Sequence, residues 1–482
     1  MQIKSMKMNA FLNGTRTLVA IIFPLITYPY ISRILGTDNL GKINFANSVV
    51  NYFQLLSALG ISSYAIREGA AYRERCGIME TFANQVFTIN VVFTGIAYSL
   101  LGITLFFFKG LTDYKELILI QSLVILGSTL GVEWLFSVYE DYLYITVRTI
   151  VIQIVSLLLM FVFVRREGDY LKYALISVIA MGGAYLINFF YSRKYFKIHP
   201  VKNVEWQKHM KPMMLLFFNT LAITIYVNSD ITILGVLKGD YHVGIYSTSV
   251  KIYTILKQVV NALIVAALPR VSFYVAAGKK KEYYSLLSKI SRALILVLMP
   301  MIVGVMMMST DIVVLVSGRD FAESGASLKL LSIAIGFSLI ASFFTTTVLL
   351  PYKKDKLILS ATIISALLNL GLNFVLIPFI AEKGAAVTTV LAEGLVMFMA
   401  VYYSRGKYRL EKIKKPVWEG SIGGIGIAII CHFVNQCVDG TFIRLSLAMA
   451  GSGLFYLIVL LVGKEELLTS TISVMAGKFK KG

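Results

Sequence analysis

Three basic residues lie deep inside apolar stretches of the chain: Arg16, Lys251 and Lys257. The other Lys and Arg residues in these stretches lie closer to an end, and we assign them to the adjoining loops. Placing a Lys or Arg at the centre of a membrane helix costs about 2.5–3.5 kcal/mol even on insertion scales that give low values. Each such residue is therefore expected to line a water-filled cavity, to pair with a counter-ion or to have a function. Ammonium and guanidinium groups pair strongly with phosphate where water is scarce. Surplus positive charge in such a place therefore indicates an anionic ligand, and a diphosphate would fit.

The three basic residues are not equally strong candidates for contact with an anionic ligand. Lys251 is the strongest candidate because it belongs to a polar helical face. Lys257 lies about 120° around the helix from Lys251, so we expect it to border the same cavity rather than line it. For Arg16 an alternative is that its long side chain reaches the membrane interface.

Two stripes of polar residues strengthen this interpretation, because they occupy matching positions in two apolar segments. Placing Gly41 on Gly244 aligns them, and steps of three and four residues keep each stripe on one helical face. We interpret them as lining a shared central cavity, with hydrogen-bonded seams between helices as the alternative. The stripes consist of Asn44, Asn47, Ser48, Asn51 and Gln54, and of Ser247, Lys251, Thr254, Gln258 and Asn261.

Three acidic residues also lie inside the apolar segments: Glu133, Asp230 and Glu393. Asp230 is a candidate to pair with Lys251 or to carry a coupling proton or sodium ion, and placement at the interface is the alternative. Three cysteines form no CxxC pair and four histidines form no cluster. We therefore expect no metal and no cofactor.

The elements that must position these residues are membrane helices. The chain of 482 residues is 57% hydrophobic and only 15% charged, far from the balance of a soluble domain. Continuous apolar runs of roughly 20 residues indicate helices rather than a barrel. Fourteen such segments can be drawn: 8–34, 41–66, 80–108, 115–138, 142–164, 171–192, 212–236, 243–268, 286–310, 324–350, 357–380, 384–404, 416–437 and 443–463.

The basic residues orient these helices. With a cytoplasmic N-terminus, about two-thirds of the 46 Lys and Arg residues fall on the cytoplasmic side, as the positive-inside rule requires. An even number of segments then places both termini in the cytoplasm, and the first helix is expected to be retained. The net charge of +20 is explained by this loop bias, and no nucleic-acid partner is expected.

The aligned stripes predict an internal repeat. Equivalent helices with the same direction imply two pseudo-symmetric lobes of six helices, related by an axis along the membrane normal. We expect an N-terminal lobe at 1–200, a C-terminal lobe at 201–410, and two additional helices with a cytoplasmic tail at 411–482. The segment 193–211 is the longest between apolar runs, so no separately folded domain is expected.

Several short motifs occur along the chain. They are Tyr28–Gly36 (YPYISRILG) leading to Leu40-Gly41, Leu268-Pro269-Arg270, Asn369–Asn373 (NLGLN), Ile377-Pro378, and Lys383–Ala386 (KGAA). With these motifs the chain resembles the polysaccharide-biosynthesis, or repeat-unit, flippases of the multidrug/oligosaccharidyl-lipid/polysaccharide exporter superfamily. Helix number and length agree with that family across nearly the whole chain.

The resemblance implies a V-shaped pair of lobes around a cationic cavity that alternates between inward-open and outward-open forms. It further implies a flippase that moves oligosaccharide repeat units on undecaprenyl diphosphate to the outer leaflet of a bacterial cytoplasmic (inner) membrane. The product would serve O-antigen, capsule or exopolysaccharide synthesis. Arg16, Lys251 and Lys257 fit the basic cavity of such a protein. A coupling proton or sodium gradient, and contacts with other polysaccharide-assembly membrane proteins, are part of this expectation.

Two other functions are alternatives to a flippase. A multidrug antiporter of the same superfamily generally needs cavity carboxylates for cationic drugs, and the basic surplus argues against it. A membrane glycosyltransferase or polymerase usually carries a sizeable external loop with catalytic groups, which this chain lacks. We therefore expect a transporter rather than an enzyme.

Overall fold

The computed structural model describes residues 6–465, and in that range the chain is helical with no strand. Eleven helices within it are long and apolar enough to cross a membrane. The predicted all-helical membrane architecture is therefore confirmed. The chain divides into two compact units, Met1–Gly244 and Ile245–Gly482, which are described separately.

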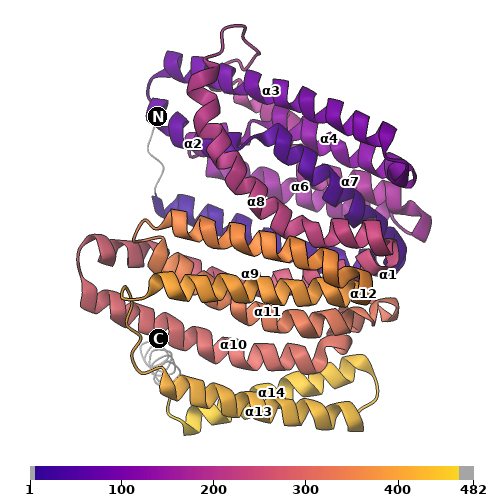
Figure 1. The fold of residues 1–482 in the computed structure, drawn as a ribbon, viewed down its shortest axis with the longest axis vertical. Coiled ribbons are helices and arrows are strands. Elements are labelled where there is room, and N and C mark those ends of the chain that lie inside the picture. The colour runs from indigo at the N-terminus through magenta and orange to yellow at the C-terminus, as the bar shows by residue number, and fades with distance from the viewer. Residues whose placement is uncertain (1–5, 466–482) are drawn as a thin grey trace, which may run out of the picture. The chain divides into compact units, whose positions relative to one another are not determined.

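The first unit is built on a long helix, α1, against which α3, α4, α6 and α8 pack (Figure 1). Two short 3₁₀ turns, Lys109–Tyr114 and Glu167–Asp169, lie between its helices. Its helices are α1 (Met6–Ala58), α2 (Ile61–Tyr72), α3 (Cys76–Phe107), α4 (Lys115–Gly131), α5 (Glu133–Val138), α6 (Tyr142–Phe163), α7 (Tyr170–Ser192) and α8 (Trp206–Lys238).

In the second unit α11 packs between α10 and α12, and a pair formed by α13 and α14 packs on α10. A 3₁₀ turn at Arg319–Phe321 precedes α11, and a π-helical turn at Thr345–Leu349 extends it. The helices are α9 (Asp240–Ala276), whose first residues belong to the first unit, α10 (Lys280–Ser317), α11 (Ser324–Phe344), α12 (Asp355–Ser404), α13 (Lys414–Cys437) and α14 (Thr441–Val462).

Three of the long helices contain a break. α1 is interrupted at Gly36, α10 at Met308, and α12 at Ile380 and Ala381. α1 and α12 therefore each contain two of the apolar segments drawn from the sequence. The count of fourteen crossings, the lobe boundaries and the V shape stay predictions. The tail at 466–482 lies outside the described residues.

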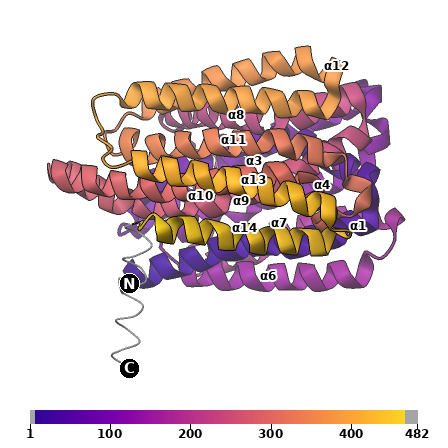
Figure 2. The same ribbon diagram turned by 90° about the horizontal axis from the view of Figure 1, so that it is seen from below.

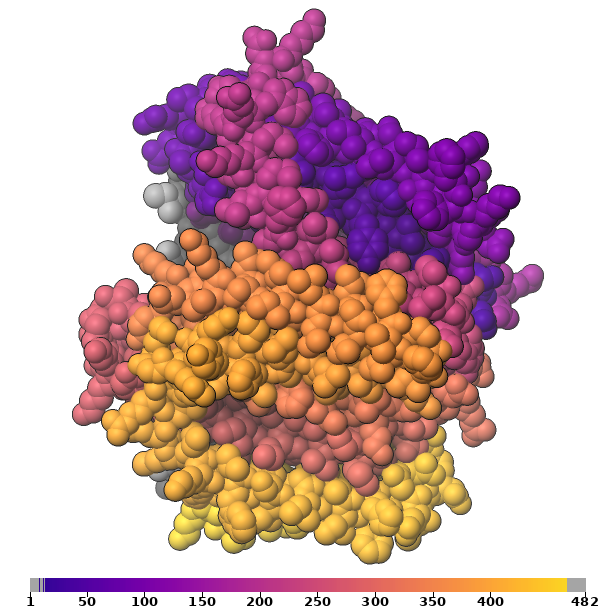
Figure 3. All heavy atoms as spheres, viewed as in Figure 1, coloured from indigo at the N-terminus to yellow at the C-terminus, as the bar shows by residue number. Residues whose placement is uncertain are grey.

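Side chains facing outward are largely aliphatic and aromatic, as a bilayer solvent requires. Phe190 is 61% exposed, Phe379 81% and Val462 78%. Inside the first unit a compact aromatic cluster forms around Phe82 and Trp134. Figure 3 shows α8 as a ridge of side chains across the face of that unit.

The junction between α8 and α9 repeats the break in α1. Gly36 has φ 72° and ψ −178°, and Gly239 has φ 87° and ψ −176°. Only glycine adopts this region readily. Because the alignment of Gly41 on Gly244 also pairs Gly36 with Gly239, the two turns are built in the same way.

The aligned glycines Gly41 and Gly244 make reciprocal close contacts. A Cβ atom on Gly41 would overlap the backbone carbonyl of Asp240, and one on Gly244 would overlap that of Thr37. Thr37 and Asp240 are themselves aligned. The start of one helix therefore touches the start of the other through the same atoms in both directions.

Candidate functional site

The stripe on the second half of α1 contributes to a hydrogen-bonded seam with α8. Asn51 Nδ2 donates to Asn228 Oδ1 at 3.2 Å, and Thr232 Oγ1 donates to Ser48 Oγ at 3.0 Å. Tyr52 also reaches Thr232, with 3.2 Å between the two hydroxyl oxygens. These residues therefore form a hydrogen-bonded seam between helices, which is the alternative to a cavity lining.

The remaining stripe residues of α1 are not used in that seam. Asn44, Asn47 and Gln54 are partly buried, and no partner for their side chains occurs in the described part of the chain. Half-buried amides without protein partners are suited to water or to a polar ligand. One side of the stripe therefore packs against α8, and the amides on its other side have no protein partner among the described residues.

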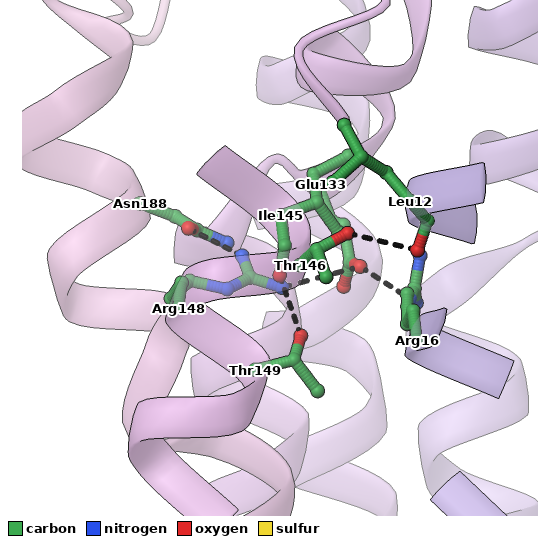
Figure 4. A network of polar contacts seen from close by, with 8 residues as sticks. All are labelled: Leu12, Arg16, Glu133, Ile145, Thr146, Arg148, Thr149 and Asn188. Carbon is green, nitrogen blue, oxygen red and sulfur yellow. Dashed lines mark hydrogen bonds and ion pairs between the residues drawn. The ribbon is translucent and has the colours of Figure 1, made fainter. Parts of the chain in front are cut away.

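Arg16 forms an ion pair inside the first unit instead of standing alone. Its Nη2 lies 3.1 Å from Glu133 Oε1, and Arg148 Nη2 lies 3.4 Å from the same oxygen (Figure 4). Arg148, on α6, also donates to Asn188 Oδ1 on α7. One carboxylate thus serves two guanidinium groups, and the cluster keeps a formal surplus of one positive charge.

Arg148 and Asn188 are site candidates that sequence reasoning missed. Arg148 lies early in its apolar segment and was assigned to the adjoining loop, yet it is only 8% exposed. The signal that could have found it is Glu133, because an acid in an apolar segment needs a cationic partner.

The second unit holds a closed charge cluster around Lys257. Its Nζ lies 2.9 Å from Glu393 Oε1 on α12, and the hydroxyl of Tyr253 donates to the same oxygen at 2.9 Å. Lys257 Nζ also donates to the Tyr253 hydroxyl at 3.2 Å. The structure therefore neutralises this lysine, consistent with a place beside a cavity rather than in it.

Lys251 has a different environment. It is partly buried, and no hydrogen bond or ion pair to it occurs among residues 6–465. One turn before it, Ser247 is 8% exposed, and its Oγ has no hydrogen-bond partner among the described residues. Thr254, partly buried, continues the same face of α9. An ammonium and a hydroxyl without protein partners on one helix face form an anion-binding arrangement.

The other predicted residues have different environments. Asn261 Oδ1 accepts a hydrogen bond from Ser342 of α11, and Gln258 is exposed. Asp230 is 6% exposed on α8 and is engaged in polar interactions. Within the described residues no group of His, Cys, Asp or Glu side chains is arranged to hold a metal ion.

The chain is similar to several known proteins whose names refer to glycan or polysaccharide biosynthesis and transport. The model of a family described as "Polysaccharide biosynthesis protein" matches residues 6–275. A protein of Escherichia coli (strain K12), named as an O-antigen transporter, is 24% identical over 80% of this chain and 93% of its own length. A protein of Shigella dysenteriae with the same kind of name is 21% identical over 78% and 95%.

Two further likenesses point the same way. A protein of Haloferax volcanii, named as a low-salt glycan biosynthesis flippase, is 27% identical over 36% of this chain and 37% of its own length. Among solved structures, the lipid II flippase MurJ in an inward closed conformation superposes with a TM-score of 0.76 at 15% identity. That likeness covers 95% of this chain and all of the other, and it establishes a shared fold.

Proposed function

The chain belongs to the polysaccharide biosynthesis protein family, and we propose that it is a flippase for lipid-linked oligosaccharides, a transporter rather than an enzyme. The relatives named as transporters and as a flippase support this activity. The finer proposal is that the cargo is a repeat unit on undecaprenyl diphosphate. The cargo moves from the cytoplasmic to the outer leaflet of a bacterial inner membrane, with both termini of the protein cytoplasmic.

The observation that carries the proposal is the pairing of charges. Arg16 and Lys257 have carboxylate partners, whereas Lys251 has none in the described chain. A partly desolvated ammonium without a counter-ion attracts an anion more strongly than a paired one. Lys251 with Ser247 and Thr254 is therefore the proposed diphosphate contact, and the unfilled amides Asn44, Asn47 and Gln54 suit sugar hydroxyls.

The transport step follows from this assignment. The diphosphate binds the cationic face in an inward-open state, and the two lobes then rock so that the sugar crosses while the lipid tail remains in the bilayer. No covalent step is needed. A proton or sodium gradient is the proposed driving force, with Asp230 as the proposed coupling group. Neighbouring polysaccharide-assembly proteins would receive the product.

The test is a leaflet-transfer assay in proteoliposomes with a labelled lipid-linked oligosaccharide. Lys251→Ala is expected to lower the transfer rate about tenfold or more, because a charge-assisted contact contributes about 1.5–3 kcal/mol. Lys251→Arg should keep much of the activity. The exposed Lys279→Ala is the matched control and should transport at the parent rate.

Three outcomes would count against the proposal. Parent-like transfer by Lys251→Ala would remove the proposed diphosphate contact. Efflux of a cationic dye without glycolipid transfer would indicate the multidrug antiporter instead. Growth of the sugar chain without leaflet transfer would indicate a glycosyltransferase or polymerase.

A further inference from the structure

A groove of about 520 Å³ runs between α6 and α7 in the first unit, separate from the stripes on α1 and α9. Figure 2 shows α6 at the edge of that unit. The outer face of α6 is apolar along its whole length, and the side chains on it are about half exposed. Such a face is typical of a helix that contacts lipid. These residues are Leu143, Val147, Val151, Leu158 and Val162.

The groove is polar at its mouth, where α6 begins and α7 ends. Lys194 Nζ donates to the Tyr191 hydroxyl at 2.9 Å and lies 3.6 Å from Asp141 Oδ2. Tyr144 stacks on Tyr191 with 3.7 Å between ring centroids. Tyr191 and Tyr195 each donate to Asp141 Oδ2 at 3.0 Å, so this carboxylate is largely satisfied by protein groups.

Farther into the groove lies a buried donor without a partner. Arg148 lines the groove, and its side chain is only 6% exposed. Its Nη atoms are used by Glu133 and Asn188, but its Nε–H has no hydrogen-bond partner in the part of the chain that the structure describes. A buried donor left unsatisfied costs about 1–3 kcal/mol, which a ligand acceptor in the groove would recover. Beyond it the lining is aliphatic, with Val151, Ile152 and Ile187.

From mouth to interior the groove offers a cation, aromatic hydroxyls, one N–H donor and then hydrocarbon. A glycerophospholipid presents the complementary groups in the same order: phosphate, ester carbonyls and acyl chain. We propose that the groove binds one anionic glycerophospholipid, with its phosphate at Lys194, an ester carbonyl at Arg148 Nε and an acyl chain along Val147 and Val151.

The charge at the mouth favours an anionic lipid over a zwitterionic one. Arg193 and Lys197 flank Lys194 in the sequence, and clustered basic residues at a helix end attract anionic headgroups. The hydrogen bond to Tyr191, with the nearby Asp141 carboxylate, raises the pKa of Lys194 above its usual value. Lys194 therefore stays charged at any physiological pH.

The test is native mass spectrometry of the full-length protein titrated with phosphatidylglycerol, phosphatidylcholine or undecaprenyl phosphate. Lys194→Glu removes the phosphate contact, and Val151→Trp fills the lipid-facing groove. Lys172→Glu is the matched control, since Lys172 is exposed near the other end of α7 and pairs with Asp169. Thermal unfolding of each variant confirms folding.

The parent is expected to retain one tightly bound phosphatidylglycerol more than either groove variant. Lys194→Glu should weaken this binding about tenfold, and Lys172→Glu should leave it unchanged. The proposal is overturned if both groove variants bind phosphatidylglycerol as the parent does, or if phosphatidylcholine occupies the site equally well. Displacement by undecaprenyl phosphate at equal concentration would also overturn it, because that lipid has no ester carbonyl.

Discussion

The carboxylate of Glu393 determines whether the ammonium group of Lys257 is paired within the protein. It accepts from both Lys257 and Tyr253, so Lys257 is held to α12 and is not available to a ligand. Buried pairs of this kind add little net stability, because desolvation offsets attraction, but removing one partner leaves an uncompensated charge. The pair therefore acts mainly to fix where α9 and α12 meet.

Glu393→Gln is expected to destabilise the protein toward the low end of about 3–5 kcal/mol, because it strands Lys257 beside an apolar helix. The low end applies since the Lys257 side chain is 32% exposed and water screens part of its charge. Thermal unfolding in detergent measures the effect. The double variant Glu393→Leu with Lys257→Met should recover most of the loss.

The matched control is Glu205→Gln, which breaks an exposed pair with Lys208 and should cost at most about 1 kcal/mol. A Glu393→Gln protein as stable as this control would mean that the pair has no structural role.

At the scale of helices, the close approach of the starts of the second half of α1 and of α9 depends on two residues without side chains. Gly41 and Gly244 each lie against backbone of the other segment. Backbone cannot move aside as a flexible side chain can, so any Cβ atom forces the helices apart. Small residues at such crossings are common where helices pack in membranes.

Gly41→Ala and Gly244→Ala are each expected to destabilise the protein by about 1–3 kcal/mol, because the added methyl group overlaps a carbonyl. Gly95→Ala on α3 is the control, since no atom lies within 4 Å of its Cβ position, and it should be neutral or slightly stabilising. Denaturant or thermal unfolding in micelles would compare the three. Equal stabilities would show that the contact relaxes at no cost.

Sequence patterns located the helices well, because the length of an apolar run is a local property. They did not reveal which polar groups meet. Lys257 and Glu393 are 136 residues apart, and helical periodicity gives a direction only within one helix. For the same reason the sequence did not indicate the role of Arg148, whose partner Glu133 lies on another helix. It also left two roles open for Asn51, packing between helices or lining a cavity, and the hydrogen bond to Asn228 shows the packing role.

For the whole molecule, the bias of Lys and Arg toward alternate loops predicts cytoplasmic termini. Two exposed native cysteines can test it. Cys76 begins α3 on the side predicted to be cytoplasmic, and Cys437 ends α13 on the side predicted to be external. Cys431 is buried and should not react.

In intact cells a membrane-impermeant maleimide is expected to label Cys437 and to spare Cys76 until the membrane is permeabilised. Variants that retain only one of these two cysteines serve as each other's control. Labelling of Cys76 alone in intact cells would reverse the proposed orientation, while the helical architecture would stand.

The reciprocal contacts of Gly41 with Asp240 and of Gly244 with Thr37 also carry a historical implication. A surface that meets its own equivalent through identical atoms in both directions is the geometry of an isologous dimer. A half-length ancestor bearing one such glycine would have bound a second copy of itself by this contact. Gene fusion would then have turned that dimer into one chain and freed each copy to diverge. Lys251, which aligns with Ser48, is one place where the copies now differ in charge.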